Sequence, residues 1–159
     1  MPNTIRSAVT GDIPLLVDLM EEFHGESGRP LDRAWAAAGF SALLGDNSLG
    51  AVWIASSEGR PGGYVVLTLR FTMEFGGLDA FIDDLYVRPS CRRRGMGQAL
   101  LGALFSDCET RGALAVHVEA GHDNLPALGL YGSRGMRAGT DGRLMLTVEL
   151  GRGAPSGTR

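Results

Sequence analysis

The sequence contains no lysine, because all fifteen of its basic residues are arginines. The phosphate loop of P-loop NTPases needs a lysine that reaches the phosphates, and pyridoxal phosphate enzymes need a lysine for their Schiff base. The missing lysine therefore excludes both kinds of site. Cysteine is nearly absent as well, and Cys91 and Cys108 lack a C-x-x-C pattern and histidines at metal-ligand spacing. We expect neither a disulfide framework nor a metal site.

A long apolar run and a surplus of positive charge are also missing. No stretch approaches the roughly 20 apolar residues that span a bilayer. Residues 1–6 lack the charged-then-apolar layout of a signal peptide. We therefore expect a soluble, cytoplasmic protein without a membrane partner. The net charge of −3 argues against a general nucleic-acid binder, which usually carries a basic surplus.

The length of 159 residues fits one domain with its own core. Hydrophobic residues make up 44% and charged residues 21% of the chain, which is ordinary for a globular protein. We assign residues 1–150 to a single domain. Residues 151–159 are rich in Gly, Pro and Ser, and we predict that this tail is disordered.

Hydrophobic periodicity predicts the order of the elements. The first helix begins at Asp12 and continues through Phe23. Further helices are predicted over about 32–44, 96–112 and 124–133. Strands are predicted over 4–9, 51–56, 63–73, 80–87, 114–119 and 144–150.

The connections between these elements predict the fold class. Short turns join the strands over 51–56, 63–73 and 80–87 into an antiparallel meander. The strand 80–87, the following helix and the strand 114–119 form a βαβ unit, which gives a parallel pair with a right-handed crossover. We predict an α+β (mixed α/β) fold with flanking helices. Its single twisted mixed sheet has about six to seven strands and is antiparallel in its N-terminal part.

An arginine- and glycine-rich loop precedes the third helix. Residues 92–97 read Arg-Arg-Arg-Gly-Met-Gly. Backbone N–H groups and the dipole at a helix start favour an anion there. Gly95 and Gly97 permit close approach, and the arginines add charge-assisted hydrogen bonds. The loop alone indicates an anion site or a solvated basic helix start. Nucleic-acid binding through this loop is disfavoured, because the sequence has no further basic stripe and no interleaved aromatic residues.

The neighbours of this loop carry a family resemblance. The segment 82–89 followed by Arg92-x-x-Gly95-x-Gly97 resembles the central motif of the GNAT superfamily of N-acetyltransferases. Asn124-x-x-Ala127-x-x-x-Tyr131 with Gly135-Met136 resembles that family's next motif. The likeness covers nearly the whole chain and is strongest to bacterial members and diamine acetyltransferases. It implies a GNAT-type fold, acetyl-CoA as the cosubstrate and acetyl transfer to an amine.

The resemblance also assigns cofactor-binding roles. Tyr86 and Val87 would be backbone partners of the pantetheine arm, residues 92–97 would hold the pyrophosphate, and Tyr131 would lie beside the sulfur. Gln98 departs from the family pattern, in which many members have a basic residue. The implied cofactor-binding set is Leu85, Tyr86, Val87, Arg92, Arg93, Arg94, Gly95, Met96, Gly97, Gln98, Asn124, Ala127 and Tyr131.

The candidate catalytic residues are Asp83, Asp84 and Tyr131. An alkyl ammonium has a pKa of about 10.4, so a base must remove its proton before it attacks a thioester. Alternation along the strand places Asp83 and Asp84 on opposite faces, Asp84 sharing a face with Ile82. The resemblance favours Asp83 as the base, acting directly or through water, and Asp84 as the group that holds a cationic substrate. A salt bridge or an exposed edge is the alternative reading of each. Tyr131 is the candidate acid that protonates the departing thiolate.

The candidate substrate-binding residues are Asp84, Glu22, His24 and Glu74. The acidic residues near the expected pocket, Asp83, Asp84, Glu74 and Glu22, favour a cationic acceptor. A solvated helix end explains Glu22 and His24 equally well. His117 and His122 have no neighbour in the sequence that suggests catalysis.

The leading hypothesis is an N-acetyltransferase that acts on a primary amine of a small cationic molecule by direct attack in a ternary complex. The alternative is a non-catalytic acetyl-CoA-binding sensor on the same fold. Exposed sheet edges favour pairing into a homodimer.

Overall fold

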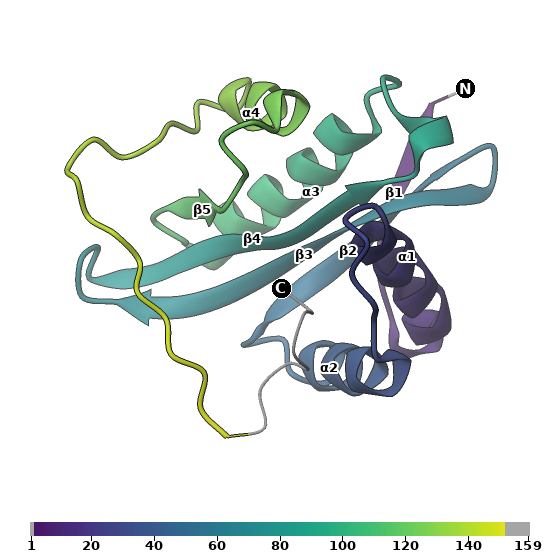
Figure 1. Ribbon diagram of the computed structural model, residues 1–159, viewed down its shortest axis with the longest axis horizontal. Coiled ribbons are helices and arrows are strands. Elements are labelled where there is room, and N and C mark those ends of the chain that lie inside the picture. The colour runs from purple at the N-terminus through teal and green to yellow at the C-terminus, as the bar shows by residue number, and fades with distance from the viewer. Residues whose placement is uncertain (1, 152–159) are drawn as a thin grey trace.

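The computed structural model describes residues 2–151 as one mixed sheet with helices on both faces (Figure 1). The strands are β1 (Asn3–Ser7), β2 (Gly50–Ser57), β3 (Arg60–Thr72), β4 (Gly77–Val87) and β5 (Val116–Val118). The helices are α1 (Ile13–Gly25), α2 (Arg33–Gly45), α3 (Met96–Arg111) and α4 (Leu125–Gly132), with single 3-10 turns at Thr10–Asp12 and Pro89–Cys91.

The sheet has the order β1–β2–β3–β4–β5 within the described residues. The first four strands pair antiparallel. Short turns join β2 to β3 and β3 to β4, whereas α1 and α2 lie in the connection between β1 and β2. Strand β5 pairs parallel with β4 and follows α3, which confirms the predicted βαβ unit. The α+β fold class and the antiparallel N-terminal part are confirmed as well.

Two apolar layers hold the helices to the sheet. On one face, Leu100, Leu101 and Leu104 of α3 are fully buried against the strands. On the other face, α1 and α2 enclose Tyr64, whose ring meets Phe40 edge-on at 6.3 Å. Each fully buried leucine contributes about 1.5–3 kcal/mol relative to an exposed one. These layers fix β4, which carries the candidate catalytic residues Asp83 and Asp84.

Local signals explain where the helices begin and end. The Asp32 carboxylate caps α2 by accepting a hydrogen bond from the N–H of Trp35 at 3.0 Å. Helix α3 lies between Gly95, with φ of 77°, and Gly112, with φ of 75°. Both glycines adopt the left-handed conformation that other residues adopt only with strain. The sequence therefore defines the length of α3 closely.

The predicted last strand over 144–150 is wrong. The segment has no regular secondary structure, and the sheet has five strands within residues 2–151 instead of six to seven. A period-two apolar pattern forms a strand only where a neighbouring strand and an apolar layer are available. Here Arg143 pairs with Glu74 at the β3–β4 turn, at 3.0 Å, and the following residues lie away from the sheet (Figure 1). The predicted disordered tail lies outside the described residues, apart from its first residue.

A β-bulge in β4 overturns the predicted alternation. Leu67 pairs with Ile82 and Val66 pairs with Asp84, so the register skips Asp83. Ile82 consequently belongs to the α3-side core, whereas Asp84 reaches Tyr64 on the opposite face. The prediction that Ile82 and Asp84 share a face is wrong, because the bulge inserts one residue into the strand.

Candidate active site

The site forms where β4 and β5 separate. Their parallel pairing covers only three positions and stops at Ile82 and Val118. Beyond that point the edge of β4 faces a cavity of about 600 Å³. The wall of this cavity comes from the end of β4, the loop before α3, the first turn of α3 and helix α4.

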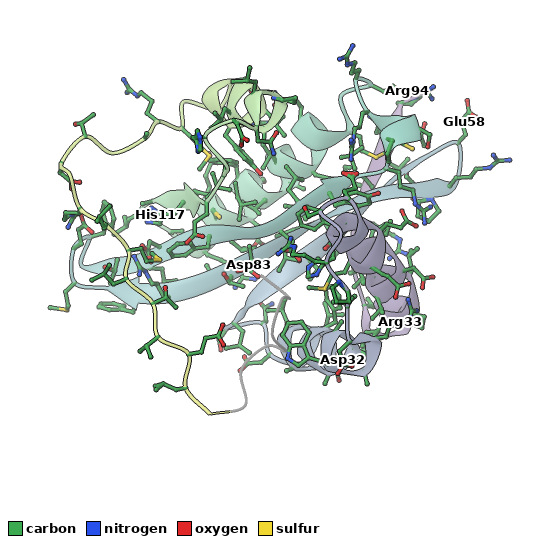
Figure 2. All side chains as sticks on the ribbon, in the orientation of Figure 1. Asp32, Arg33, Glu58, Asp83, Arg94 and His117 are labelled. Carbon is green, nitrogen blue, oxygen red and sulfur yellow. The ribbon has the colours of Figure 1, made fainter. Side chains whose placement is uncertain are left out.

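The structure brings together the predicted cofactor-binding residues, with one exception. Arg94 does not line the cavity: its carbonyl accepts a hydrogen bond from the Asn3 side chain at 2.9 Å (Figure 2). The predicted residues that line the cavity are Leu85, Tyr86, Val87, Arg92, Arg93, Gly95, Met96, Gly97, Gln98, Asn124, Ala127 and Tyr131.

Sequence reasoning missed several residues of this wall. Phe23 and Glu26 at the end of α1 line the cavity, as do Cys91, Pro126 and Leu130. The α1 residues come from a part of the chain far from the loop, so no local motif signals them. Pro126 and Leu130 lie inside the motif that begins at Asn124 and ends at Tyr131. Their helical spacing from Tyr131 was the signal that could have identified them.

The two glycines of the loop serve different purposes. Gly95 has φ of 77° and ample room around its Cα, so its role is backbone conformation. A Cβ on Gly97 would lie 3.2 Å from Cδ2 of Leu130, so Gly97 permits close packing of α3 on α4. Together they place the free N–H groups of the α3 N-terminus beside the cavity. This geometry fits an anionic group such as a pyrophosphate.

Arg92 is engaged by a carboxylate of the same chain. Its Nη2 lies 2.6 Å from both carboxylate oxygens of Glu26. Its Nε donates to the Val87 carbonyl at 2.8 Å, and its guanidinium lies over the Tyr86 ring at 5.9 Å. A phosphate that binds Arg92 must therefore compete with Glu26. The end of α1 and the phosphate loop are thereby coupled.

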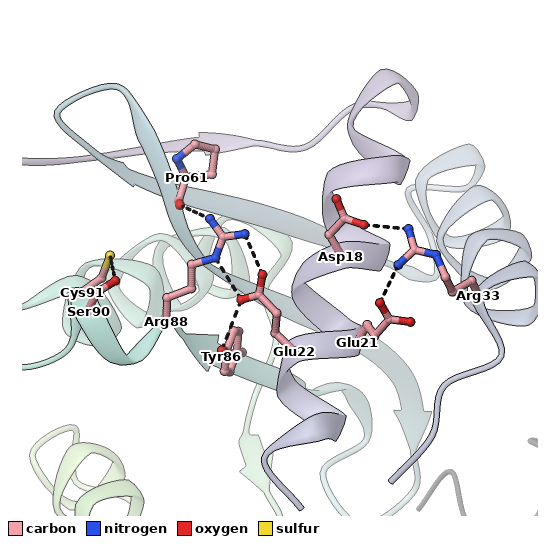
Figure 3. A network of polar contacts seen from close by, with 9 residues as sticks. All are labelled: Asp18, Glu21, Glu22, Arg33, Pro61, Tyr86, Arg88, Ser90 and Cys91. Carbon is pink, nitrogen blue, oxygen red and sulfur yellow. Dashed lines mark hydrogen bonds and ion pairs between the residues drawn. The ribbon is translucent and has the colours of Figure 1, made fainter. Parts of the chain in front are cut away.

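Glu22, a candidate substrate-binding residue, is instead part of a link between α1 and β4 (Figure 3). Its carboxylate accepts from Nε and Nη2 of Arg88 at 2.9 and 2.8 Å. Arg88 also donates to the Pro61 carbonyl at 2.9 Å, and the Tyr86 hydroxyl points to Glu22 at 3.4 Å. On the far side of α1, Arg33 at the start of α2 forms ion pairs with Asp18 and Glu21 of α1, which join the two helices (Figure 3). Glu22 thus fixes the strand end that borders the cavity.

Tyr131 stands between two cavities. Its side chain is 9% exposed and lines both the 600 Å³ cavity and a second one of about 1210 Å³. Burial raises the pKa of Tyr131, and the negative charge of Asp84 raises it further. The hydroxyl therefore stays protonated at neutral pH. Asp84 itself accepts a hydrogen bond from the buried Tyr64 hydroxyl at 3.0 Å.

Asp83 and Asp84 differ in surroundings because of the bulge. Asp84 is half-buried and close enough to Tyr131 to act on its titration. Burial and the charge of Asp84 raise the pKa of Tyr64 well above its ordinary value. Asp83 is exposed at the bulge (Figure 2).

His117 has a partner that sequence reasoning missed. Its Nε2 lies 2.8 Å from Oδ2 of Asp79, a side chain with 0% exposure. Arg70 binds the same carboxylate through Nε and Nη2, and these hydrogen bonds lower the pKa of Asp79, with His117 contributing. The ionised carboxylate accepts from His117, whose ring lines the second cavity. The β4–β5 register creates the pair, and the sequence does not define that register.

Two further candidate substrate-binding residues lie elsewhere. His24 is buried edge-on against Phe23, and burial lowers its pKa. Glu74 is bound to Arg143 at the β3–β4 turn. Neither residue lines either of the two cavities.

Two absences apply to residues 2–151. No group of three His, Cys, Asp or Glu side chains there is arranged to hold a metal ion. No helix in that range combines the length and apolar character needed to cross a membrane.

Comparison with known families identifies the fold family of the chain. The model of the acetyltransferase (GNAT) family matches residues 14–136, which is most of the chain. The chain is a member of the GNAT family. Members of this family use acetyl-CoA as the cosubstrate, and the chain is an acyltransferase enzyme by this membership. The predicted resemblance is confirmed at the level of the superfamily, whereas the diamine acetyltransferase branch has no specific support.

Individual relatives agree with this membership. The [ribosomal protein bS18]-alanine N-acetyltransferase of Escherichia coli K12 is 25% identical over 138 residues, covering 87% of this GNAT chain and 83% of the relative. The crystal structure of an integron cassette protein from the mobile metagenome of Cole Harbour Salt Marsh is 39% identical. It has a TM-score of 0.84 and covers 98% of this chain and 93% of its own. A predicted acetyltransferase from Clostridium acetobutylicum, solved with acetyl-CoA, has a TM-score of 0.75 at 22% identity and covers 92% and 96%.

Proposed function

We propose that this GNAT enzyme transfers the acetyl group of acetyl-CoA to a primary amine of a cationic acceptor, by direct attack in a ternary complex. The observation that carries the proposal is the position of Tyr131. On one side it borders the cavity formed by the family's cofactor-binding residues. On the other it borders a larger cavity with room for a second substrate. A residue in that place can contact both substrates at the point where they meet.

The cofactor-side cavity offers partners suited to each part of CoA. The open edge of β4 at Tyr86 and Val87 presents backbone groups to an amide-containing arm. The N–H groups at the start of α3 and the guanidinium of Arg92 favour the pyrophosphate. Asn124 lies at the start of α4 in the same wall. Its side-chain oxygen accepts from the N–H of Ala127 at 3.3 Å, so it also fixes the helix that carries Tyr131.

The proton transfers follow from Asp84 and Tyr131. The acceptor ammonium must lose a proton before its nitrogen attacks the thioester carbonyl, and Asp84 takes up that proton directly or through water. The nitrogen then bonds to the carbonyl carbon, the C–S bond breaks, and the Tyr131 hydroxyl donates its proton to the thiolate that leaves. The raised pKa of Tyr131 keeps this proton in place until then. The nitrogen gives up its second proton, through water, to the Tyr131 oxygen, which restores the hydroxyl. Asp83, favoured by the family resemblance, is the alternative base.

Two carboxylates of β4, which lie outside the linings of both cavities, support a cationic substrate. Asp83 and Asp84 both lie where β4 leaves its parallel partner, and the charge of Asp84 acts on the pKa of Tyr131. An ammonium gains Coulomb energy there that a neutral acceptor does not. The E. coli relative is named for acting on an alanine of a ribosomal protein, so a peptide N-terminus is an acceptor to be compared with small amines.

Two measurements test the proposal. Thermal unfolding with and without CoA reports on the cofactor cavity, and we expect a higher Tm with CoA. Thiol release from acetyl-CoA is then followed against a panel of polyamines, amino acids, aminoglycosides and alanyl peptides, with anionic amines as controls. We expect turnover with cationic acceptors that depends on Tyr131 and Asp84. An unchanged Tm at high CoA concentration overturns the cofactor site. A raised Tm without turnover on any amine favours the non-catalytic sensor.

A further inference from the structure

A histidine lies in the wall of the larger cavity, which the proposed function assigns to the second substrate. His117 and Tyr131 both line this cavity of about 1210 Å³. His117 lies on β5 directly before Val118, where the parallel pairing with β4 ends (Figure 2). Its side chain is 35% exposed. The imidazole is therefore accessible from the cavity, close to the point where the two strands separate.

Three side chains fix the orientation of this imidazole. Its Nε2 lies 2.8 Å from Oδ2 of Asp79, a fully buried carboxylate to which Arg70 also donates. The centre of the imidazole ring lies 4.9 Å from that of Phe81 and 6.1 Å from that of Phe75. A carboxylate that binds one ring nitrogen of a histidine determines which state the other nitrogen presents. His117 is thus held as a functional histidine is held.

The hydrogen bond with Asp79 also determines where the imidazole carries its proton. The hydrogen bonds from Arg70, and then that from His117, lower the pKa of Asp79. The carboxylate is therefore ionised at neutral pH and can only accept, so the proton of the neutral ring lies on Nε2. Within residues 2–151 no protein group pairs with Nδ1, and this atom is not buried. A lone pair is therefore available at the cavity wall.

A hydrogen-bond acceptor at this position suits an amine or an ammonium group, because both supply N–H donors. The charged residues of the same wall are less suited to that task. Arg134 and Arg137 are cations, and Arg134 is already bound to Gln98. Glu109 lies in the last turn of α3 and is exposed. His117 is the residue of this wall that combines a fixed orientation with an accessible lone pair.

We propose that His117 binds the nitrogen of the acceptor by accepting an N–H hydrogen bond at Nδ1, and that Asp79 is the positioning residue that keeps the proton on Nε2. This role rests on the proposed acetyl transfer, which places the second substrate in the larger cavity. The bond holds the ammonium beside the end of the β4–β5 pairing while Asp84 takes up its proton. Primary amines have N–H groups for both interactions, whereas quaternary ammonium ions have none.

Protonation of His117 gives acceptor binding a pH dependence. A protonated ring carries N–H groups at both nitrogens, so it can no longer accept, and its charge opposes an ammonium. We therefore expect acceptor binding to weaken as the pH falls. The charged groups around the ring are Asp79 of β4, which binds it, and Arg70 of β3, which binds Asp79. Glu109 and Arg134 lie in the same cavity wall.

The first test is NMR of the isotope-labelled imidazole nitrogens of the full chain at about pH 8. We expect a proton on Nε2 and a bare Nδ1 for His117. Propylammonium, which is charged at this pH, should shift the Nδ1 resonance. Tetramethylammonium has the same charge without an N–H group and should not shift it. The opposite tautomer, or an equal response to the two cations, overturns the proposal.

The second test is His117→Gln, which removes Nδ1 but keeps an amide N–H that can donate to Asp79. We expect the KM for each amine that the wild type acetylates to rise roughly 10–100-fold, because a hydrogen bond to a charged group is lost. The kcat should change by less than about threefold, and the CoA-induced rise in Tm should be kept. The variant should also lack the increase in KM that the wild type shows at low pH. His122→Gln changes an exposed histidine outside both cavities, and it should keep the wild-type KM.

The results separate this role from the proposed acetyl transfer. A wild type that binds CoA but acetylates no amine overturns acetyl transfer, and the tautomer with the two-cation titration then decides the role of His117. An unchanged KM in His117→Gln overturns that role. So does a comparable rise in KM in Glu109→Gln with none in His117→Gln, because the ammonium then binds the carboxylate of α3 instead.

Discussion

Nε2 of His117 lies 2.8 Å from Oδ2 of Asp79, so a side chain of β5 is fastened to a fully buried carboxylate of β4. Arg70 of β3 binds the same carboxylate from the other side at 2.9 and 3.0 Å. The carboxylate thus joins three strands at the end of the sheet where β4 and β5 begin their parallel pairing. The position of β5, and with it the width of the separation beside Tyr131, depends on this cluster.

Asp79→Asn tests the structural weight of the cluster. The variant loses the charge that Arg70 and His117 contact, so we expect a loss of about 1–3 kcal/mol in the free energy of unfolding at pH 7. Denaturant titration measures this loss. Asp18→Asn, which removes an exposed carboxylate of α1, is the matched control and should change stability by less than about 1 kcal/mol.

The same variant gives a pH dependence with a defined sign. The pKa of Asp79 is lowered in the folded protein, so the folded state binds fewer protons than the unfolded state around this pKa. The stabilisation that the Asp79 charge provides is complete above pH 3.8, the ordinary pKa of an aspartate, and it declines as the pH falls below that value. We expect the stability difference between the wild type and Asp79→Asn to shrink below about pH 4. A difference that stays constant down to pH 2 would show that the charge of Asp79 contributes nothing.

Tyr131→Phe separates chemistry from binding. Loss of the hydroxyl removes the proposed acid, and we expect the rate of thiol release to fall by roughly 10²–10³-fold with CoA binding nearly unchanged. The raised pKa of Tyr131 also predicts that the wild-type rate shows no fall from tyrosine ionisation up to about pH 9. Steady-state rates across pH 6–9 and CoA thermal shifts test both statements. Equal rates for the two proteins would assign Tyr131 to packing.

Much of the site was predictable because its signals are local. The loop 92–97 and the α4 residues Asn124 and Tyr131 combine short-range patterns with fixed helix and strand periods. Once a segment is identified as a helix or a strand, its repeat determines which side chains lie on the same face. Arg94 illustrates the limit within such a motif. Arg93 has φ of 61° in this loop, and of the three consecutive arginines Arg92 and Arg93 line the cavity whereas Arg94 does not.

The features that sequence reasoning missed depend on pairing between distant segments. The His117–Asp79 pair requires the β4–β5 register, and a shift of one residue would exchange the faces. The bulge at Asp83 depends on how β3 and β4 fit together, which neither strand encodes alone. Residues 144–150 were expected to form a strand because their apolar residues alternate at period two. The pattern does not state whether a neighbouring strand is available to pair with them.

Glu26→Gln tests the competition at Arg92. Two short contacts of 2.6 Å hold the guanidinium against Glu26, and the charge of Glu26 opposes a phosphate in the same place. An exposed ion pair contributes about 0.2–1 kcal/mol, so its removal should tighten CoA binding by up to about fivefold. Calorimetric titration with CoA measures the change, and Glu21→Gln on the same helix is the control. Weaker binding would instead mean that Glu26 orients Arg92 for the cofactor.

Gly95→Ala tests whether the phosphate loop depends on its backbone conformation. The φ of 77° at Gly95 is strained for alanine, and we expect a loss of about 1–2 kcal/mol in stability together with weaker CoA binding. Gly129→Ala is the matched control, because Gly129 lies inside α4 with nothing within 4 Å of a new Cβ. Helix propensity predicts that this second change stabilises the protein by about 0.5–1 kcal/mol. Denaturant and CoA titrations of both variants distinguish the two effects. If Gly95→Ala kept full stability and affinity, the left-handed turn before α3 would have no part in presenting the helix N–H groups to the phosphates.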